Sequence, residues 1–304
     1  MRIVFMGTPE FAVPSLERLY HDGHDVSAVF TQPDKKRNRG MNLSFSPVKQ
    51  LAIEHSTPVY QPESLKDGEA LEILRKLECE LIAVVAYGKL LPREILELPS
   101  FGCVNIHGSL LPKYRGAAPI QWAVINGETE TGVTSMFMAE ELDAGDMLFC
   151  GKTAIGENET SGDLHDRLSI LGAELLSETV TAILRGEAVR IPQDSNAATF
   201  APPLHKNMSS IDWADTALNI KNKIRGLNPW PTATAEFSGK TYKIFTANIQ
   251  FMESARTPGT IVSEGAEGVA VACADGVVMI KELQAPGGKR MAASDFLRGN
   301  SICL

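Results

Sequence analysis

Short β-prone runs alternate with amphipathic helical patterns through the first part of the chain, and this alternation constrains the fold more than any other feature. The apolar run at residues 2–7 ends in a glycine turn, a helical pattern covers residues 13–23, and a second β-prone run covers residues 26–32. Further helical patterns separate these from a strongly β-prone run at residues 81–88. Such alternation favours a parallel sheet with helices on both faces. We therefore predict an α/β, Rossmann-like domain over residues 1–190.

Proteins of this class bind ligands beyond the carboxyl ends of their parallel strands. The turn after the first predicted strand, GTPEFAVPS, has no GxGxxG pattern. A dinucleotide site at that turn is therefore poorly supported. A binding site is expected at the end of another strand.

The pattern changes in the last third of the chain. One long amphipathic helix is predicted over residues 161–186, after which residues 191–206 lose this periodicity and are rich in proline, serine and asparagine, as linkers are. A short basic helix at residues 215–227 precedes short alternating strands with glycine turns. We predict a linker at residues 191–206 and a small OB-like β-barrel domain at residues 207–304.

Composition excludes several classes of protein. Of the 304 residues, 22% are charged and 44% are apolar. No apolar run reaches the roughly 18 residues of a transmembrane helix. The beginning of the chain has no signal-peptide pattern, and the five cysteines form no CxxC pair. We expect a soluble, cytoplasmic protein in a reducing compartment, with no membrane anchor and no metal.

Charge is distributed unevenly along the chain. Residues 1–204 contain 18 lysines and arginines against 28 aspartates and glutamates, whereas residues 205–304 contain 11 against 9. The last third is therefore mildly basic in a chain of formal net charge −8. This is weak support for a polyanionic partner, because such contacts depend on where charges cluster. A solvated basic face explains the same composition.

A carboxamide and an imidazole stand two residues apart at the end of a predicted strand, in VNIHGSLLPKYRG. Asn105 and His107 share one face if the strand geometry persists. An asparagine amide donates without ionising and histidine exchanges protons near neutral pH, so the pair suits polarisation of a carbonyl with proton transfer. Asp143, in LDAGDML, is the candidate carboxylate that orients the imidazole. A hydrogen-bonded core histidine and an aspartate that only forms a turn are the alternative.

The stretch NIHGSLLPKYRG, followed about thirty residues later by LDAGDML, resembles the signature of the 10-formyltetrahydrofolate-dependent formyltransferases. Other collinear stretches resemble the methionyl-tRNA formyltransferases of that family, among them MRIVFMGTPEFAVPSL, SPVK, VVAYGKLLP, IRGLNPWPTA and DFLRGN. The resemblance extends over nearly the whole chain. It implies transfer of a formyl group from 10-formyltetrahydrofolate to the α-amino group of methionine esterified to initiator tRNA.

The resemblance also implies roles for individual residues. Asn105 is expected to donate to the formyl oxygen, His107 to stabilise the oxyanion and assist proton movement, and Asp143 to hold and tune His107. Neither a metal nor a covalent enzyme intermediate is required, and a monomer is expected. The residues expected to contact the folate co-substrate are Tyr87, Gly88, Ser109, Leu110, Leu111 and Pro112.

Four of the five residues from Lys35 to Arg39 are positively charged, inside an otherwise acidic part of the chain. By itself such a run is usually a solvated loop. In the family that the chain resembles, the matching insertion reaches the tRNA acceptor stem, and Arg39 stands where a functionally important arginine does. Lys206 is the second residue expected to contact tRNA, although Pro203 stands where family members often have a further lysine.

Two other functions remain open. A formyltransferase acting on a nucleotide-linked amino sugar would share Asn105, His107 and Asp143, but it has no need of a basic loop and a basic second domain. A non-catalytic folate- or nucleotide-binding module of the same fold has no need of all three candidates. Formyl transfer to charged initiator tRNA, beside elongator methionyl-tRNA and free methionine, discriminates among these functions.

Overall fold

The computed structural model describes residues 1–37, 42–250 and 256–302, and its internal contacts group the chain into two compact units. The N-terminal unit comprises residues 1–119, 131–153 and 165–201. The C-terminal unit comprises residues 120–130, 154–164 and 202–304. Two short internal segments of the chain therefore belong to the unit that is formed mainly by its end.

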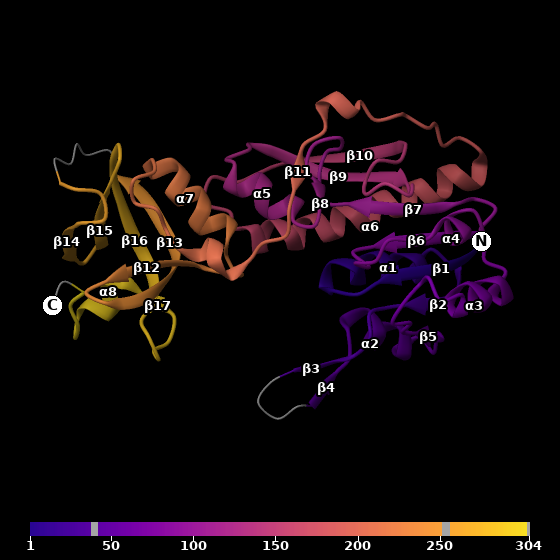
Figure 1. Ribbon diagram of the computed structural model, residues 1–304, viewed down its shortest axis with the longest axis horizontal. Helices are drawn as coiled ribbons and strands as arrows, with labels where there is room; N and C mark the ends of the chain where they lie inside the picture. Colours follow the sequence, from indigo (N-terminus) through magenta and orange to yellow (C-terminus); the bar gives the residue numbers. More distant parts are fainter. Residues whose placement is uncertain (38–41, 251–255, 303–304) are drawn as a thin grey trace. The chain divides into compact units, whose positions relative to one another are not determined.

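A sheet of seven described strands forms the centre of the N-terminal unit, in the order β10-β9-β7-β6-β1-β2-β5 (Figure 1). The strands are β1 (Arg2–Gly7), β2 (Asp25–Phe30), β5 (Val59–Tyr60), β6 (Leu81–Val85), β7 (Cys103–His107), β9 (Glu130–Phe137) and β10 (Met147–Ala154). The neighbours from β7 through β6, β1 and β2 to β5 pair in parallel, and β9 pairs antiparallel with β7. The predicted Rossmann-like parallel sheet is confirmed.

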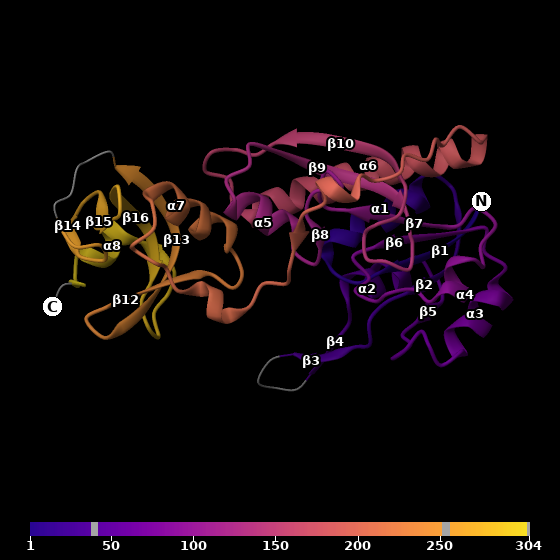
Figure 2. The same cartoon turned by 45° about the horizontal axis from the view of Figure 1, so that its top comes forward.

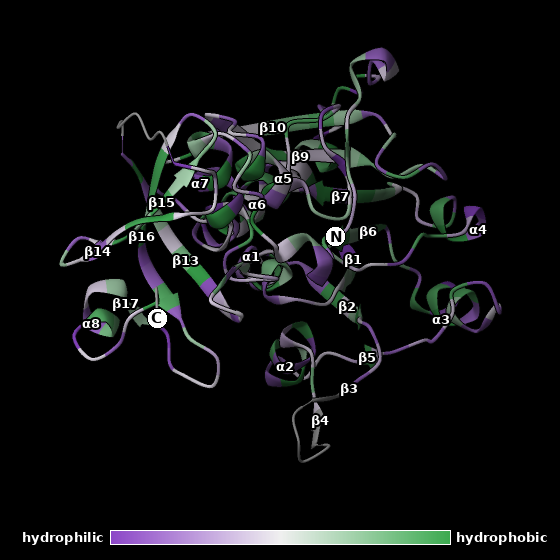
Figure 3. Cartoon of the chain, turned by 60° about the vertical axis from the view of Figure 1, so that its left-hand side comes forward, coloured by the Kyte–Doolittle hydropathy of each residue, from purple (hydrophilic) through white to green (hydrophobic). Residues whose placement is uncertain are grey.

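Helices cover both faces of this sheet, as the alternating sequence pattern predicts (Figure 3). They are η1 (Glu10–Ala12), α1 (Val13–His21), α2 (Pro47–Glu54), α3 (Glu69–Leu77), α4 (Arg93–Leu96) and α6 (Ser161–Arg185). Leu74 of α3 and Ile95 of α4 are buried in one core with Val84 of β6. On the other face, a Cβ at Gly172 of α6 would stand 3.0 Å from Ile106 of β7, so the glycine lets this helix pack closely on the strand.

Three polar residues on either side of the hairpin of β3 (Lys35–Arg37) and β4 (Asn42–Ser44) form a cluster. Asp34 comes before the hairpin in the sequence, and Lys49 and Gln61 come after it. Lys49 Nζ donates to Asp34 Oδ2 at 2.5 Å and to Gln61 Oε1 at 2.7 Å. Gln61 Nε2 in turn donates to Asp34 Oδ1 at 2.9 Å. Burial raises the pKa of Asp34, but the hydrogen bonds from Lys49 and Gln61 and the charge of Lys49 together outweigh it, so the pKa lies below its ordinary value.

This depressed pKa predicts how the stability depends on pH. Because the folded state holds Asp34 ionised more strongly than the unfolded state, its contribution is present above about pH 4 and is lost as the pH falls through the folded pKa. Asp34→Asn is expected to lower the free energy of unfolding by about 1–2 kcal/mol at pH 7. Urea unfolding at pH 7, 4 and 2.5 measures this difference, which should shrink towards pH 2.5.

The matched control for this measurement is Asp67→Asn, because Asp67 is exposed and its Oδ1 bond to Glu69 N survives as the amide oxygen. The control should change stability by less than about 0.5 kcal/mol at every pH. A difference between Asp34→Asn and wild type that stays constant from pH 7 to pH 2.5 would contradict the role of the carboxylate.

The segment after α6 is tied to the N-terminal unit. The short strand β11 (Phe200–Ala201) pairs in parallel with β8 (Arg115–Gly116). A Cβ at Gly116 would stand 2.7 Å from Ala201 O, and the φ of Gly116 is +121°, so a larger residue does not fit at this crossing. Residues 200–201 of the predicted linker at residues 191–206 are therefore held by backbone pairing.

The C-terminal unit contains six described strands, in the order β12-β13-β16-β15-β14 (Figure 2), with β17 paired to β16 (Figure 1). They are β12 (Ala233–Phe237), β13 (Lys240–Gln250), β14 (Ile261–Gly265), β15 (Gly268–Cys273), β16 (Gly276–Gln284) and β17 (Met291–Ala292). All these pairings are antiparallel, which confirms the predicted β domain. None of the described pairings joins β12 to β14, so the closure of the predicted OB-like barrel stays a prediction.

The remaining helices of the chain are short. They are α5 (Pro119–Ile125), η2 (Ser195–Ala197), η3 (Lys206–Ser209), α7 (Ala217–Gly226) and α8 (Ala293–Leu297). In the described part of the chain, no helix combines the length and the apolar character that crossing a membrane requires.

The cationic side chains of the basic helix predicted at residues 215–227 contact other groups of the C-terminal unit. Lys221 and Arg225 of α7 are only 7% and 9% exposed. Lys221 Nζ donates to Glu157 Oε1 at 3.0 Å, and Arg225 Nη1 donates to Gly156 O at 3.1 Å. Lys223 Nζ donates to Ser210 O at 2.5 Å. All three cations of this helix therefore have partners within the unit, which leaves them poorly placed to bind a phosphate backbone.

Candidate active site

A pocket of ≈ 460 Å³ opens in the N-terminal unit where β6 and β7 end. Its walls include the apolar side chains of Val84, Leu90, Met136 and Met138. This position beyond the carboxyl ends of parallel strands is where ligands bind in open α/β sheets. An apolar pocket into which a few polar groups converge is the usual form of a small-molecule site.

Asn105 and His107 both line this pocket, as their spacing on a strand predicts. They pair with Met136 and Thr134 of β9, so regular strand geometry continues to the end of β7. Asn105 is half-buried, and its carboxamide forms no hydrogen bond with any described residue. Its donors and acceptor are therefore free to bind a ligand in the pocket.

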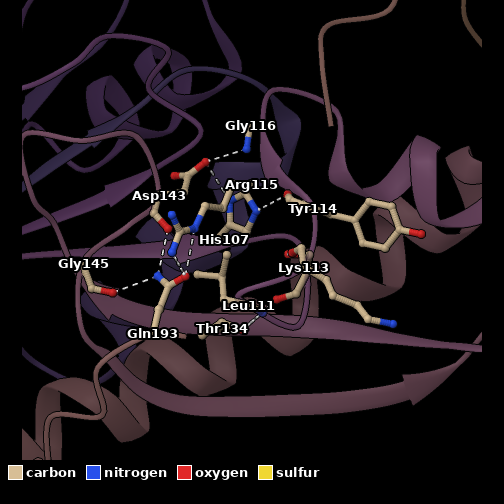
Figure 4. Close-up of polar contacts among 11 residues, drawn as sticks. His107, Leu111, Lys113, Tyr114, Arg115, Gly116, Thr134, Asp143, Gly145 and Gln193 are labelled. Carbon is tan, nitrogen blue, oxygen red and sulfur yellow. Dashed lines mark hydrogen bonds and ion pairs between the residues drawn. The ribbon is translucent and has the colours of Figure 1, made fainter. Parts of the chain in front are cut away.

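His107 is held at both edges of its ring and is only 6% exposed (Figure 4). Its Nε2 lies 2.9 Å from Tyr114 O, and because a carbonyl only accepts, this nitrogen is the one that carries a hydrogen. Its Nδ1 lies 3.6 Å from Asp143 Oδ2, which is longer than a hydrogen bond, and the two groups form an ion pair only when the ring is protonated. A core histidine explains the contact with Tyr114, but it does not explain a carboxylate at the other edge of the ring in the same pocket.

Asp143 is held in a tight turn that directs its carboxylate into the pocket. Its Oδ2 accepts a hydrogen bond from Gly116 N at 2.8 Å. The φ of Asp143 is +52°, a left-handed conformation that aspartate and asparagine tolerate better than most residues. A Cβ at Gly145 would clash with Phe137 O, so the shape of the turn requires a glycine at this position. The structure thus brings Asn105, His107 and Asp143 to one pocket.

The residues predicted to contact folate fall into two groups. Tyr87 and Gly88 line the pocket. Tyr87 is 2% exposed, its hydroxyl has no partner among the described residues, and burial raises the pKa of this tyrosine to about 12. Its side chain is therefore a neutral phenol at neutral pH.

The second group, Ser109, Leu110, Leu111 and Pro112, is not among the residues that line the pocket. These residues shape the turn that follows β7. Ser109 Oγ donates to Lys113 O at 2.6 Å, and Leu111 N donates to Thr134 Oγ1 at 3.1 Å. The turn therefore leads the chain back to Tyr114 and Gly116, whose backbone groups contact the imidazole and the carboxylate.

Of the two residues predicted to contact tRNA, the structure describes one. Arg39 lies outside the described residues. Lys206 is exposed at the beginning of η3 in the C-terminal unit. Exposure leaves its ammonium group accessible to a phosphate, as the prediction requires.

Sequence reasoning missed the backbone and side-chain groups that hold the catalytic candidates. Gly116 N, Tyr114 O and the side chains of Arg115 and Gln193 all contact the site or the turns that form it. The stretch VNIHGSLLPKYRG contains Tyr114, Arg115 and Gly116, so the motif includes these residues, but it does not predict what their backbone and side-chain groups contact. No sequence pattern predicts a contact for Gln193, because this residue lies in the segment predicted as a linker.

The chain belongs to the formyl transferase family. The family model described as formyl transferase matches residues 1–180, and the model described as formyl transferase, C-terminal domain, matches residues 203–301. The two matches together extend over nearly the whole chain. The family that the motifs predict is therefore confirmed.

Three relatives with high sequence identity to this chain share the same protein name. Proteins named methionyl-tRNA formyltransferase from Alkaliphilus oremlandii and Caldanaerobacter subterraneus are 47% and 50% identical to this chain, over 99% of it and over 97% and 98% of their own lengths. The protein of that name from Pelotomaculum thermopropionicum is 51% identical over 99% of this chain and 96% of its own length.

Solved structures share the fold at low sequence identity. An N-formyltransferase from Helicobacter canadensis, in complex with folinic acid and dTDP-3-aminofucose, has a TM-score of 0.69 at 19% identity and covers 95% of this chain and 99% of its own. HypX from Aquifex aeolicus in complex with tetrahydrofolic acid has a TM-score of 0.63 at 19% identity and covers 98% of this chain and 47% of its own. These likenesses support the fold.

Proposed function

We propose that this chain transfers the formyl group of 10-formyltetrahydrofolate to the α-amino group of methionine on initiator tRNA, as a cytoplasmic monomer. The observation that carries the proposal is the convergence of Asn105, His107 and Asp143 in one pocket. Relatives that are 47–51% identical over 99% of the chain bear the name of this activity. In this proposal residues 1–190 form the catalytic domain, residues 207–304 bind tRNA, and residues 191–206 join them.

The pocket offers both surfaces that a folate formyl donor needs. Its apolar walls at Val84, Leu90 and Met136 suit a flat heterocycle, while its polar groups stand together at the end of β7. The neutral phenol of Tyr87 lines the same pocket and adds an aromatic surface without charge. The formyl carbon would lie near Asn105 and His107.

The proposed chemistry is attack of the methionine amine on the formyl carbon, after which the bond between that carbon and N10 of the folate breaks and tetrahydrofolate leaves with a proton on N10. As the new C–N bond forms, the formyl oxygen gains negative charge, and preorganised donors aimed at that oxygen lower the barrier. The amide of Asn105, which has no partner among the described residues, donates to it. His107 accepts the amine proton at Nδ1, because its Nε2 donates to Tyr114 O. The charged ring then stabilises the negative oxygen, and the carboxylate of Asp143 compensates the positive charge on the ring.

The tRNA part of the proposal rests on the basic loop and on Lys206, because the cations of α7 are mostly engaged within the C-terminal unit. Arg39→Ala is expected to lower kcat/KM for charged tRNA by about tenfold or more, because a phosphate or base-edge contact is lost. The Kd for the folate co-substrate should change by less than about threefold. Steady-state kinetics and fluorescence titration measure the two quantities.

Arg75→Ala is the matched control for the loop, because Arg75 lies on α3 and its side chain is 55% exposed. It should leave both quantities unchanged. Equal losses of tRNA formylation and of folate binding in Arg39→Ala would instead place the loop over the folate pocket.

The proposed function is tested by its acceptor. Purified full-length protein is supplied with 10-formyltetrahydrofolate and either charged initiator tRNA, charged elongator methionyl-tRNA, free methionine or a dTDP-linked amino sugar. Formylation should be fastest with initiator methionyl-tRNA and negligible with free methionine and the sugar. Formylation of the amino sugar without formylation of the tRNA would overturn the proposal in favour of the sugar-modifying alternative.

A further inference from the structure

Gln193 connects the turn of Asp143 to the loop after β7, although 50 residues of sequence separate it from that turn (Figure 4). Its Nε2 donates to Asp143 O and to Gly145 O, at 2.8 Å each. Its Oε1 accepts from Arg115 Nε at 3.0 Å and from Arg115 Nη2 at 2.8 Å. All four contacts fix the amide in one orientation, because the flipped amide would place its oxygen against two carbonyl oxygens.

The segment that carries Gln193 holds the loop after β7 at further points. Thr199 Oγ1 accepts from Tyr114 N at 2.9 Å, and Thr199 O accepts from Arg115 N at 2.8 Å. Ala201 O accepts from Ala117 N at 2.9 Å. The residues between these anchors supply the two backbone groups that contact the catalytic candidates, Tyr114 O and Gly116 N.

The turn of Asp143 needs such support from outside. Its left-handed φ of +52° is a sparsely populated conformation, which persists where the surroundings fix it. The Gln193 amide nitrogen donates to two carbonyl oxygens of this turn, while its oxygen accepts from Arg115, a residue of the loop that is only 3% exposed. Gln193 thus fixes the carboxylate and the loop relative to one another, and His107 lies between these two elements.

We propose that Gln193 is a positioning residue for formyl transfer, which acts by holding Asp143 against His107. The inference rests on the proposed function. A misplacement of about 1 Å in catalytic geometry costs on the order of a hundredfold in rate. Loss of the Gln193 contacts therefore lowers kcat while the apolar pocket, which binds the folate, keeps its shape.

Two substitutions in the full-length protein test this proposal. Gln193→Glu keeps the length of the side chain and its bond with Arg115, but it cannot donate to Asp143 O or Gly145 O. Gln193→Met removes all four hydrogen bonds at similar volume. Both are expected to lower kcat for formylation of charged tRNA by about tenfold to a hundredfold, with the KM for 10-formyltetrahydrofolate changed by less than about threefold.

Asn196→Ala is the matched control, because Asn196 is an exposed carboxamide three residues further along the same segment. It should keep the wild-type kcat. Thermal unfolding and fluorescence titration of folate check that each variant is folded and binds folate. If Gln193→Met does not fold, Gln193→Glu still gives the answer, since it preserves the contact with Arg115.

A double substitution separates positioning from a general structural role. If Gln193 acts through Asp143, adding Gln193→Glu to Asp143→Asn should lower kcat by less than about threefold further, because the two residues act as one unit. A kcat within threefold of wild type in both single Gln193 variants, or losses that multiply fully in the double variant, would overturn the inference. Full activity of Asp143→Asn alone would also overturn the inference, because Asp143 would then only form a turn, whereas absence of tRNA formylation by the wild-type protein would overturn the proposed function.

Discussion

Replacement of either Asn105 or His107 by alanine is expected to lower kcat for formyl transfer on the order of a hundredfold or more. Both side chains line the pocket from one face of β7, and both would stabilise the oxygen that becomes negative during the reaction. Their contribution is made in the transition state, so the KM for 10-formyltetrahydrofolate should change little. Single-turnover and steady-state kinetics with charged initiator tRNA measure the loss.

The same prediction has a sharp control in exposed residues of the same two types. Asn196→Ala and His21→Ala alter side chains on the surface of the N-terminal unit, and the His21 side chain is 83% exposed. Both should retain wild-type kcat. If Asn105→Ala and His107→Ala also stay within threefold of wild type while folate still binds, the catalytic assignment is wrong, and the non-catalytic binding module gains support.

The parallel sheet could be predicted because local signals agree with the tertiary structure there. The predicted strands at residues 2–7 and 26–32 correspond to β1 and β2, and the run at residues 81–88 contains β6. Each is an apolar run that the sheet buries on both faces, so periodicity and packing demand the same residues. The helix predicted at residues 161–186 likewise matches α6.

The candidate catalytic residues could be predicted for a different reason. Asn105 and His107 have chemistry that a strand end can use, and Asp143 has a turn sequence that explains its conformation. The sequence positions of these three residues do not by themselves predict that the side chains lie close together in space. The resemblance to the family predicts this proximity, and the pocket that all three residues line agrees with it.

The supports of the site could not be predicted from local pattern. Gln193 and Arg115 are 78 residues apart, and the pair β8 and β11 contains only two residues in each strand. Contacts this short leave no periodicity in the sequence. Proline and polar residues in the segment after α6 indicate a linker, whereas the structure uses its backbone and its glutamine to hold the loop after β7.

The charge of α7 shows a second limit of sequence patterns. A run of lysines and an arginine on a helix is typical of a surface that binds a polyanion. In the structure, Lys221 and Arg225 are buried against segment 154–164, which belongs to the same unit. Buried cations of this kind are satisfied by carbonyl and carboxylate oxygens and no longer serve a phosphate. Net charge alone therefore overstated the basic surface of the C-terminal unit.

Asp143→Asn is expected to lower kcat by about a hundredfold or more, with the fold and folate binding preserved. Asparagine tolerates the left-handed φ of +52° as aspartate does, and its amide oxygen still accepts from Gly116 N. What is lost is the negative charge 3.6 Å from His107 Nδ1, which compensates the charge on the ring as the amine proton is transferred. Steady-state kinetics of the variant, beside a thermal melt, separate lost charge from lost structure.

Asp146→Asn is the matched control for this carboxylate, because it removes one negative charge three residues further along the same segment without touching the pocket. Its kcat should stay within about twofold of wild type, which would exclude a general effect of net charge on tRNA binding. Asp143→Glu restores the charge on a longer side chain and should recover part of the lost kcat, since the carboxylate returns to the neighbourhood of His107. If Asp143→Asn retains full activity, Asp143 only forms a turn, and His107 must work without a carboxylate partner.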